Sequence, residues 1–304
     1  MLATTNGAIW LLSTPNGRKG FFFREWSDAS ETWRKISVPA NECSRISAEF
    51  LAEERRKNGP AIFEREYLCK FLTSGDTYFD VDAMEASAAA AESPAQLGQS
   101  YLSTRFFVGF DLGQKSTPSA IVLLEKVLVT TQERDPVTWS WVQRTEIHLL
   151  RAERLPLNMT YEAVAAKLRS VIRSLPNTKD VTLVMDATGC GAPFVDLLRK
   201  QPIGALTMPV TITASGAPSM TNGAHRISKT DLMKSLNYLI SSPDFKINAP
   251  AEDHRAIMQE LQNIRMLSST SGAMRFTSSE QDDLVMALAL AAWPARKFLI
   301  PRQP

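Results

Sequence analysis

The sequence has few of the residues that mark secreted, metal-stabilised or membrane proteins. Its three cysteines are far apart, and none has a second Cys or His at the spacing of a metal site. This argues against a disulfide framework and a zinc site, and a reducing compartment fits best. The most apolar run, residues 284–293, is about half as long as a membrane-spanning helix. Residues 1–7 lack a basic segment, so no export signal is predicted.

The sequence also lacks an excess of either charge. Lys and Arg number 34 and Asp and Glu 32, which gives a net charge of +2. Any binding site for a polyanion must therefore be a local cluster of cations. The hydrophobic content of 44% over 304 residues is ordinary for a packed core, and the length allows one large domain or two modest ones.

Three regions differ in pattern along the chain. Residues 1–75 predict short strands at 8–12 and 33–38, followed by helices at 48–57 and 61–68. Because so few strands precede the helices, this region looks like the incomplete end of a domain. Residues 76–104 are rich in Ala, Ser, Glu and Gln and are interpreted as a connector. A second domain is expected over residues 105–304.

The second domain is predicted to be α/β. Three successive β-rich runs suggest a meander, and strands then alternate with helices. The predicted strands are 106–110, 120–129, 139–149, 181–185, 206–212 and 274–276. The predicted helices are 161–175, 193–199, 228–240, 251–267 and 280–293, the last one stopped by Pro294.

Two predicted strands each end in an aspartate. Asp111 follows the apolar run 106–110, and Asp186 follows 181–185 just before a glycine-rich turn. Alternatively, Asp111 only shapes a turn with Gly113, and Asp186 only caps the next helix. Ligand sites of α/β sheets collect at the carboxyl ends of strands, so two such acids in one domain favour a functional site.

A pair of acids, Asp282 and Asp283, stands at the start of the last predicted helix. Ser278 and Gln281 resemble a capping box, and the helix beyond Asp283 is apolar on every side, so it should be buried. One acid of the pair should therefore point inward. The alternative is compensation of the helix dipole, which is worth only about 0.3–1 kcal/mol.

Carboxylates that converge in one cleft repel each other unless a cation lies between them. Mg²⁺ and Mn²⁺ prefer oxygen ligands, and two such ions about 3.5–4 Å apart can stabilise both the attacking and the leaving oxygen of a phosphodiester. The acids therefore predict metal-dependent phosphodiester hydrolysis.

The segments around these acids resemble a known family. Similar segments are Phe107–Glu125, the D-A-T-G-x-G segment within Val184–Leu198 and the D-D-L-V-x-A-L-A-L-A helix within Gln281–Ala291. Further matches are residues 12–17, 20–22 and 65–71. Together they resemble the large subunit of tailed-phage DNA-packaging terminases, from the end of its ATPase domain through its nuclease domain.

The resemblance implies a ribonuclease H-like mixed sheet flanked by helices and a two-metal site for Mg²⁺ or Mn²⁺. By similarity, Asp111, Asp186 and Asp283 would be the catalytic, metal-binding carboxylates, with Asp282 as a neighbouring acid. The expected activity is endonucleolytic cutting of concatemeric viral double-stranded DNA in the cytoplasm of a bacterial host. The portal and the small terminase subunit would be partners. The residues Ser13, Thr14 and Pro15 resemble the coupling motif of the ATPase domain.

The chain departs from this family in three places. It has Thr117 and Gln281 where relatives often carry an acid and a His, and no G-x-x-x-x-G-K-[ST] loop is present to bind ATP phosphates. We therefore expect a chain that begins inside the ATPase domain and has no ATPase activity on its own. Candidate DNA phosphate contacts are Lys115, Arg226 and Lys229, although for any one of them a solvated surface charge is the more common role.

Two other interpretations remain. Actin-like and sugar-kinase ATPases also have a strand that ends in D-L-G, as residues 111–113 do, but they do not explain the paired acids of the last helix. The other alternative is an inactive prophage remnant.

Overall fold

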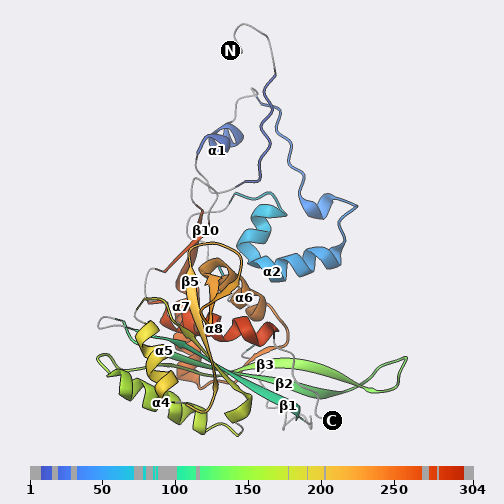
Figure 1. The fold of residues 1–304 in the computed structure, drawn as a ribbon. Helices are drawn as coiled ribbons and strands as arrows, with labels where there is room; N and C mark the ends of the chain where they lie inside the picture. The colour runs from blue at the N-terminus through green and yellow to red at the C-terminus, as the bar shows by residue number, and fades with distance from the viewer. Residues whose placement is uncertain are drawn as a thin grey trace.

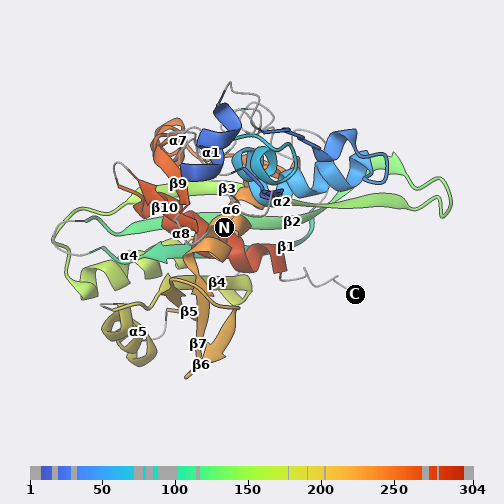
Figure 2. The same cartoon turned by 90° about the horizontal axis from the view of Figure 1, so that it is seen from above.

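A mixed β-sheet with helices on both faces forms the body of the computed structural model (Figures 1 and 2). The structure describes residues 8–15, 20–28, 33–71, 78–79, 85, 87, 101–113, 117–176, 178–189, 191–201, 203–268, 274–278 and 281–297. Across the sheet, the strands are β6 (Ser219–Thr221), β7 (Ala224–Ser228), β5 (Leu206–Thr213), β4 (Val181–Asp186), β1 (Tyr101–Asp111), β2 (Ala120–Arg134), β3 (Trp141–Arg154) and β8 (Phe245–Ile247). The α/β prediction is confirmed.

The order of the strands is that of a ribonuclease H fold. The strands β1, β2 and β3 form the predicted antiparallel meander, and β4 then pairs in parallel with the free side of β1. The strand β5 adds in parallel to β4. The central order is therefore 3-2-1-4-5, which confirms the predicted ribonuclease H-like sheet.

Two separate cores cover the two faces of the sheet. One lies under α4 (Tyr161–Arg173) and α5 (Gly191–Lys200), and the other lies under α6 (Lys229–Ile240), α7 (Ala251–Asn263) and α8 (Asp283–Lys297). Residues 283–295 of α8 are all buried, as the apolar pattern predicts. The helix α8 thus lies in the interior and brings its first residue to the end of the sheet.

The boundaries of α7 and α8 differ from the prediction. The helix α7 ends at Asn263 and is followed by the strand β9 (Ile264–Ser268), which pairs with β10 (Met274–Ser278). Because Ser278 belongs to β10 and α8 begins at Asp283, the predicted capping box is wrong. Pro294 lies inside α8 instead of stopping it, and Lys126 donates a hydrogen bond to the carbonyl of Ala295 at 2.7 Å.

The front of the chain contains α1 (Gly20–Ser27), the short helix η2 (Ala40–Glu42) and α2 (Ala48–Glu66) above the sheet in Figure 1. Residues 8–12 and 33–38 are not in a strand ladder, so the two predicted front strands are wrong. The two predicted helices form the single helix α2, with Ser47 as its N-cap, and Gly59 and Pro60 lie within it. Within the described residues, no helix has both the length and the apolar character needed to cross a membrane.

Candidate active site

Two of the three predicted acids lie side by side at one end of the sheet. The strands β1 and β4 run parallel, and Phe110 is in register with Met185. The residues that follow, Asp111 and Asp186, therefore emerge at the same edge. One oxygen of Asp186 accepts a hydrogen bond from the backbone N–H of Thr188 at 2.7 Å, which holds the turn after β4.

The third acid reaches this edge because α8 lies directly against β1. A Cβ atom added to Gly109 would stand 1.9 Å from the backbone oxygen of Ala287, so only glycine allows this close approach. At the start of α8, Asp283 is 7% exposed, and its Oδ2 has no hydrogen-bond partner among the described residues. Asp283 is thus the member of the acid pair that points inward.

The neighbouring acid is oriented differently. The side chain of Asp282 is 31% exposed, and its Oδ2 forms an ion pair with Lys229 Nζ at 3.0 Å. Lys229 is the first residue of α6, so this contact joins the starts of two helices. The predicted phosphate contact Lys229 therefore lies at the acid cluster.

The acids influence one another's protonation. Burial, followed by the charges of Asp186, Asp283 and Asp282, raises the pKa of Asp111 to about 8, although Lys229 acts in the opposite direction. Burial also raises the pKa of Asp186 and of Asp283. Because these acids resist being ionised together, a cation bound between them would stabilise their charged forms.

The chemistry of these side chains fits a divalent cation with oxygen ligands. Three carboxylates share one edge of the sheet, and a buried carboxylate oxygen of Asp283 is left without a partner among the described residues. As they stand, however, no three His, Cys, Asp or Glu side chains of the described part of the chain form a group that could hold a metal ion. Joint ligation of one ion by these acids stays a prediction.

Among the residues that the structure describes, no hydrogen bond or ion pair joins the acids to the other predicted DNA-contacting residues. Arg226 is exposed on β7 next to the start of α6, and Lys115 lies outside the described residues. Glu260 on α7 was not predicted from the sequence; it is buried near the start of α8 and pairs with Arg154. A signal was available, because Glu260 follows Ile257 by three positions and precedes Leu261, on the buried face of its helix.

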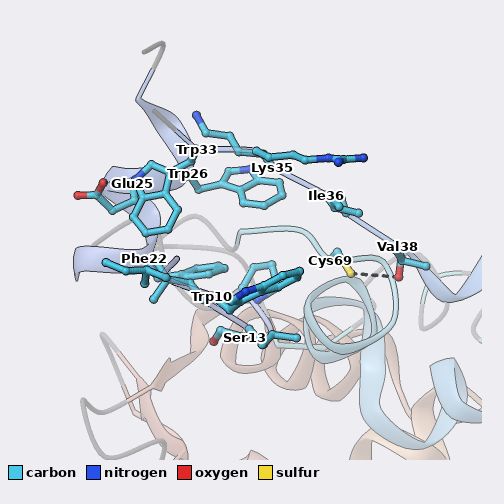
Figure 3. Close-up of a pocket in the computed structure, with 16 residues that line it drawn as sticks. Trp10, Ser13, Phe22, Glu25, Trp26, Trp33, Lys35, Ile36, Val38 and Cys69 are labelled. Carbon is cyan, nitrogen blue, oxygen red and sulfur yellow. Dashed lines mark hydrogen bonds between the residues drawn. The ribbon is translucent and has the colours of Figure 1, made fainter. Parts of the chain in front are cut away.

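The residues that resemble a coupling motif lie in another part of the molecule. Ser13 and Pro15 help line a cavity of about 430 Å³ that is walled mainly by apolar and aromatic side chains of the front segment, with Thr14 between them in the chain (Figure 3). Its walls include Trp10, which is 81% exposed. None of the predicted acids lines this cavity.

The chain is similar to several solved structures. One is the large terminase nuclease from thermophilic phage G20c with bound magnesium, at 20% identity and a TM-score of 0.40, over 62% of this chain and 80% of that chain. Another is the nuclease domain of the large terminase subunit gp2 of bacterial virus Sf6, at 11% identity and a TM-score of 0.46, over 70% of this chain and 97% of that chain. Both are phage terminase nucleases. They are of the family that the sequence motifs resemble.

No protein-family profile matches the chain, and no curated protein matches it. The function proposed below is therefore argued from the chemistry of Asp111, Asp186 and Asp283.

Proposed function

We propose that this chain is a metal-dependent endonuclease that cuts concatemeric viral double-stranded DNA during genome packaging. The supporting observation is that Asp111 and Asp186 at the ends of two parallel strands and Asp283 at the start of a buried helix come close enough for the charges of Asp186 and Asp283 to raise the pKa of Asp111. Acids in this arrangement suit divalent cations and a phosphodiester substrate.

Each residue has a part in this proposal. Asp111, Asp186 and Asp283 would hold Mg²⁺ or Mn²⁺, with Asp282 beside them. Either ion, when bound, lowers the pKa of a water molecule and stabilises negative charge on phosphate oxygens. Lys229 limits the negative charge of the cluster through its ion pair with Asp282. With Arg226 and Lys115, Lys229 is also a candidate contact for DNA phosphates.

The wider setting is part of the same proposal. Residues 1–75 would be the end of a terminase ATPase domain, residues 76–104 a connector and residues 105–304 the nuclease domain. The portal and the small terminase subunit would be partners, and the host cytoplasm the location. Ser13, Thr14 and Pro15 would be the remnant of the ATPase coupling motif.

A plasmid-cutting assay with Mn²⁺ or Mg²⁺ tests the activity. We expect the wild-type protein to convert supercoiled DNA to open-circular and linear forms, and EDTA to abolish the cutting. Asp186→Asn should reduce the rate by at least about 100-fold, because it removes a charge that would hold the metal. The amide oxygen of the new side chain can still accept the hydrogen bond from Thr188.

Asp196→Asn is the matched control, since Asp196 is an exposed acid on α5 whose side chain is 65% accessible. This variant should cut as fast as the wild type. Equal cutting by wild type and Asp186→Asn would reject the assignment of the site. Specific ATP binding in calorimetry would instead favour the actin-like alternative.

A further inference from the structure

The start of α8 is capped by a side chain from another helix. The residue before α8 is Asp282, and its carbonyl accepts the first helical hydrogen bond, from Met286 N at 2.9 Å. A capping side chain at that position would accept from the second or third N–H of the helix, which belong to Leu284 and Val285. The carboxylate of Asp282 is instead paired with Lys229.

Glu260 supplies the acceptor that is normally provided locally. It lies near the end of α7, is 2% exposed, and its Oε2 accepts a hydrogen bond from Val285 N at 2.9 Å. Its other oxygen, Oε1, is hydrogen-bonded to the guanidinium of Arg154. Both oxygens of this buried carboxylate are therefore engaged, one by α8 and one by the sheet.

Arg154 connects this contact to the strand that carries Asp111. Ala120 is in register with Arg154 on β3 and with Asp111 on β1. The helix α7 is also held to β3 by Asp253, whose Oδ2 accepts a hydrogen bond from Ala152 N at 2.8 Å. Asp111 thus shares a row of paired strand residues with Arg154, and two hydrogen bonds connect Arg154, through Glu260, to the first turn of α8.

We propose that Glu260 is a positioning residue of the nuclease site, which acts with Arg154 by capping α8 in place of Asp282. This cap fixes the first turn of α8 against the sheet, so that neither the Asp282 carboxylate, which pairs with Lys229, nor the Asp283 carboxylate is needed to cap the helix. The proposal rests on the proposed nuclease function. This role of Glu260 differs from a purely structural one, because loss of the cap should move Asp283 relative to Asp111 even in a folded protein.

The test compares two substitutions of one residue. Glu260→Gln keeps an oxygen that can accept from Val285 N, whereas Glu260→Leu has a similar size and no acceptor. We expect Glu260→Leu to weaken Mn²⁺ binding, measured by calorimetry on folded protein, by about 10–100-fold, and Glu260→Gln to stay within about 3-fold of wild type. In hydrogen exchange, the Val285 amide should lose protection in Glu260→Leu only.

Ile257→Ala is the control for lost stability, because Ile257 is a fully buried residue one turn earlier in α7. It should lower the melting temperature while Mn²⁺ affinity remains that of wild type. Arg154→Gln is a second variant, since the side chain of Arg154 is 35% exposed and its replacement leaves the core intact. It should weaken Mn²⁺ binding at least about 5-fold.

The outcomes separate the two proposals. If wild-type protein binds Mn²⁺ and cuts DNA while Glu260→Leu and Arg154→Gln bind Mn²⁺ equally well, the positioning role is wrong and the nuclease function stands. If Glu260→Gln fails as badly as Glu260→Leu, the charge of Glu260 matters and the cap does not. If the wild-type protein neither binds Mn²⁺ nor cuts DNA, both proposals fall.

Discussion

Gly109 controls how closely α8 approaches the sheet. Its missing side chain leaves room for the backbone of Ala287 and Ala291, and a Cβ atom there would stand 1.9 Å from the first and 2.9 Å from the second. Backbone atoms of a buried helix cannot rotate away as a flexible side chain can. The position of Asp283 therefore depends on a residue that carries no functional group.

We expect Gly109→Ala to destabilise the protein by about 1–3 kcal/mol or more, because it overpacks the contact between β1 and α8. Urea unfolding measures this loss. DNA cutting should also fall in the fraction that remains folded, since α8 must shift away from Asp111. Gly204→Asn is the control: Gly204 has a positive φ but no neighbouring atoms within 4 Å of an added Cβ. A Gly109→Ala protein as stable as the wild type would contradict the prediction, and Gly204→Asn shows the cost of strain at a glycine without overpacking.

His148 joins two strands through charged contacts inside the sheet. Its Nε2 lies 3.1 Å from Glu146 Oε2, and its Nδ1 lies 3.7 Å from Glu125 Oε2. Burial lowers the pKa of His148, but the contacts with Glu125 and Glu146 outweigh this effect and raise it overall. The hydrogen bond from His148, together with the contact from Arg144, lowers the pKa of Glu146 to about 2 against the effect of burial.

These shifts define a pH range. The raised pKa of His148 stabilises the fold below pH about 6.5, and this contribution disappears as the pH rises through the folded-state value. The lowered pKa of Glu146 stabilises the fold above pH about 4.5, and this contribution is lost as the pH falls towards 2. His148 and Glu146 together therefore stabilise the fold most between about pH 4.5 and 6.5.

His148→Gln should flatten the pH dependence of stability. Between pH 5.5 and 8.5, the wild-type free energy of unfolding should fall more steeply than that of the variant, because His148 loses its proton and its charged contacts over this range. Urea unfolding at the two pH values measures the difference, with His254→Gln as a histidine control outside this cluster. Parallel pH profiles for wild type and His148→Gln would show that the cluster does not titrate as described.

At the scale of elements, α8 shows what a local pattern can and cannot predict. Its apolar residues on every side predicted a buried helix, and residues 283–295 are all buried. Its start was predicted incorrectly because the capping acceptor comes from Glu260, more than twenty residues earlier in the chain. A capping pattern such as Ser278 with Gln281 reports only local partners, so a cap supplied by α7 leaves no such local signal.

The strands were predicted best where they are central. The β-rich runs identified β1, β2 and β3. The strand β2 continues to Arg134, past its predicted end at 129, and forms a projecting hairpin with the start of β3 (Figure 1). At its other end, β3 continues to Arg154, past its predicted end at 149. Register and neighbours depend on contacts between distant segments, so the pairing of β1 with β4 could be expected only from the family resemblance. The meeting of Asp111 and Asp186 at one edge follows from that pairing.

The front segments show the opposite case. Residues 8–12 and 33–38 have strand-like composition but lie outside any ladder. Strand propensity needs a neighbouring strand to be realised, and none of the described front residues provides one. Trp10 and Leu12 consequently remain 81% and 87% exposed.

At the scale of the whole molecule, the front is joined to the body through α2. Ile62 of α2 is 4% exposed and belongs to the same buried cluster as α6 and α8. Asn237 of α6 is fully buried, and its Nδ2 donates a hydrogen bond to the carbonyl of Arg56 at 3.3 Å. The packing of α2 therefore extends the core that holds the site's helix.

This shared core predicts that α2 and the sheet unfold together. Ile62→Ala should cost about 2–5 kcal/mol through the cavity that it leaves, and calorimetry should show a single transition moved to lower temperature. Ile36→Ala is the control, because Ile36 is 64% exposed and its loss should change stability by about 0.5 kcal/mol or less. The calorimetric scan could instead resolve two unfolding transitions, with Ile62→Ala lowering the temperature of only the smaller one. That result would mean that α2 is a separate unit and that the core beneath α8 is stable without it.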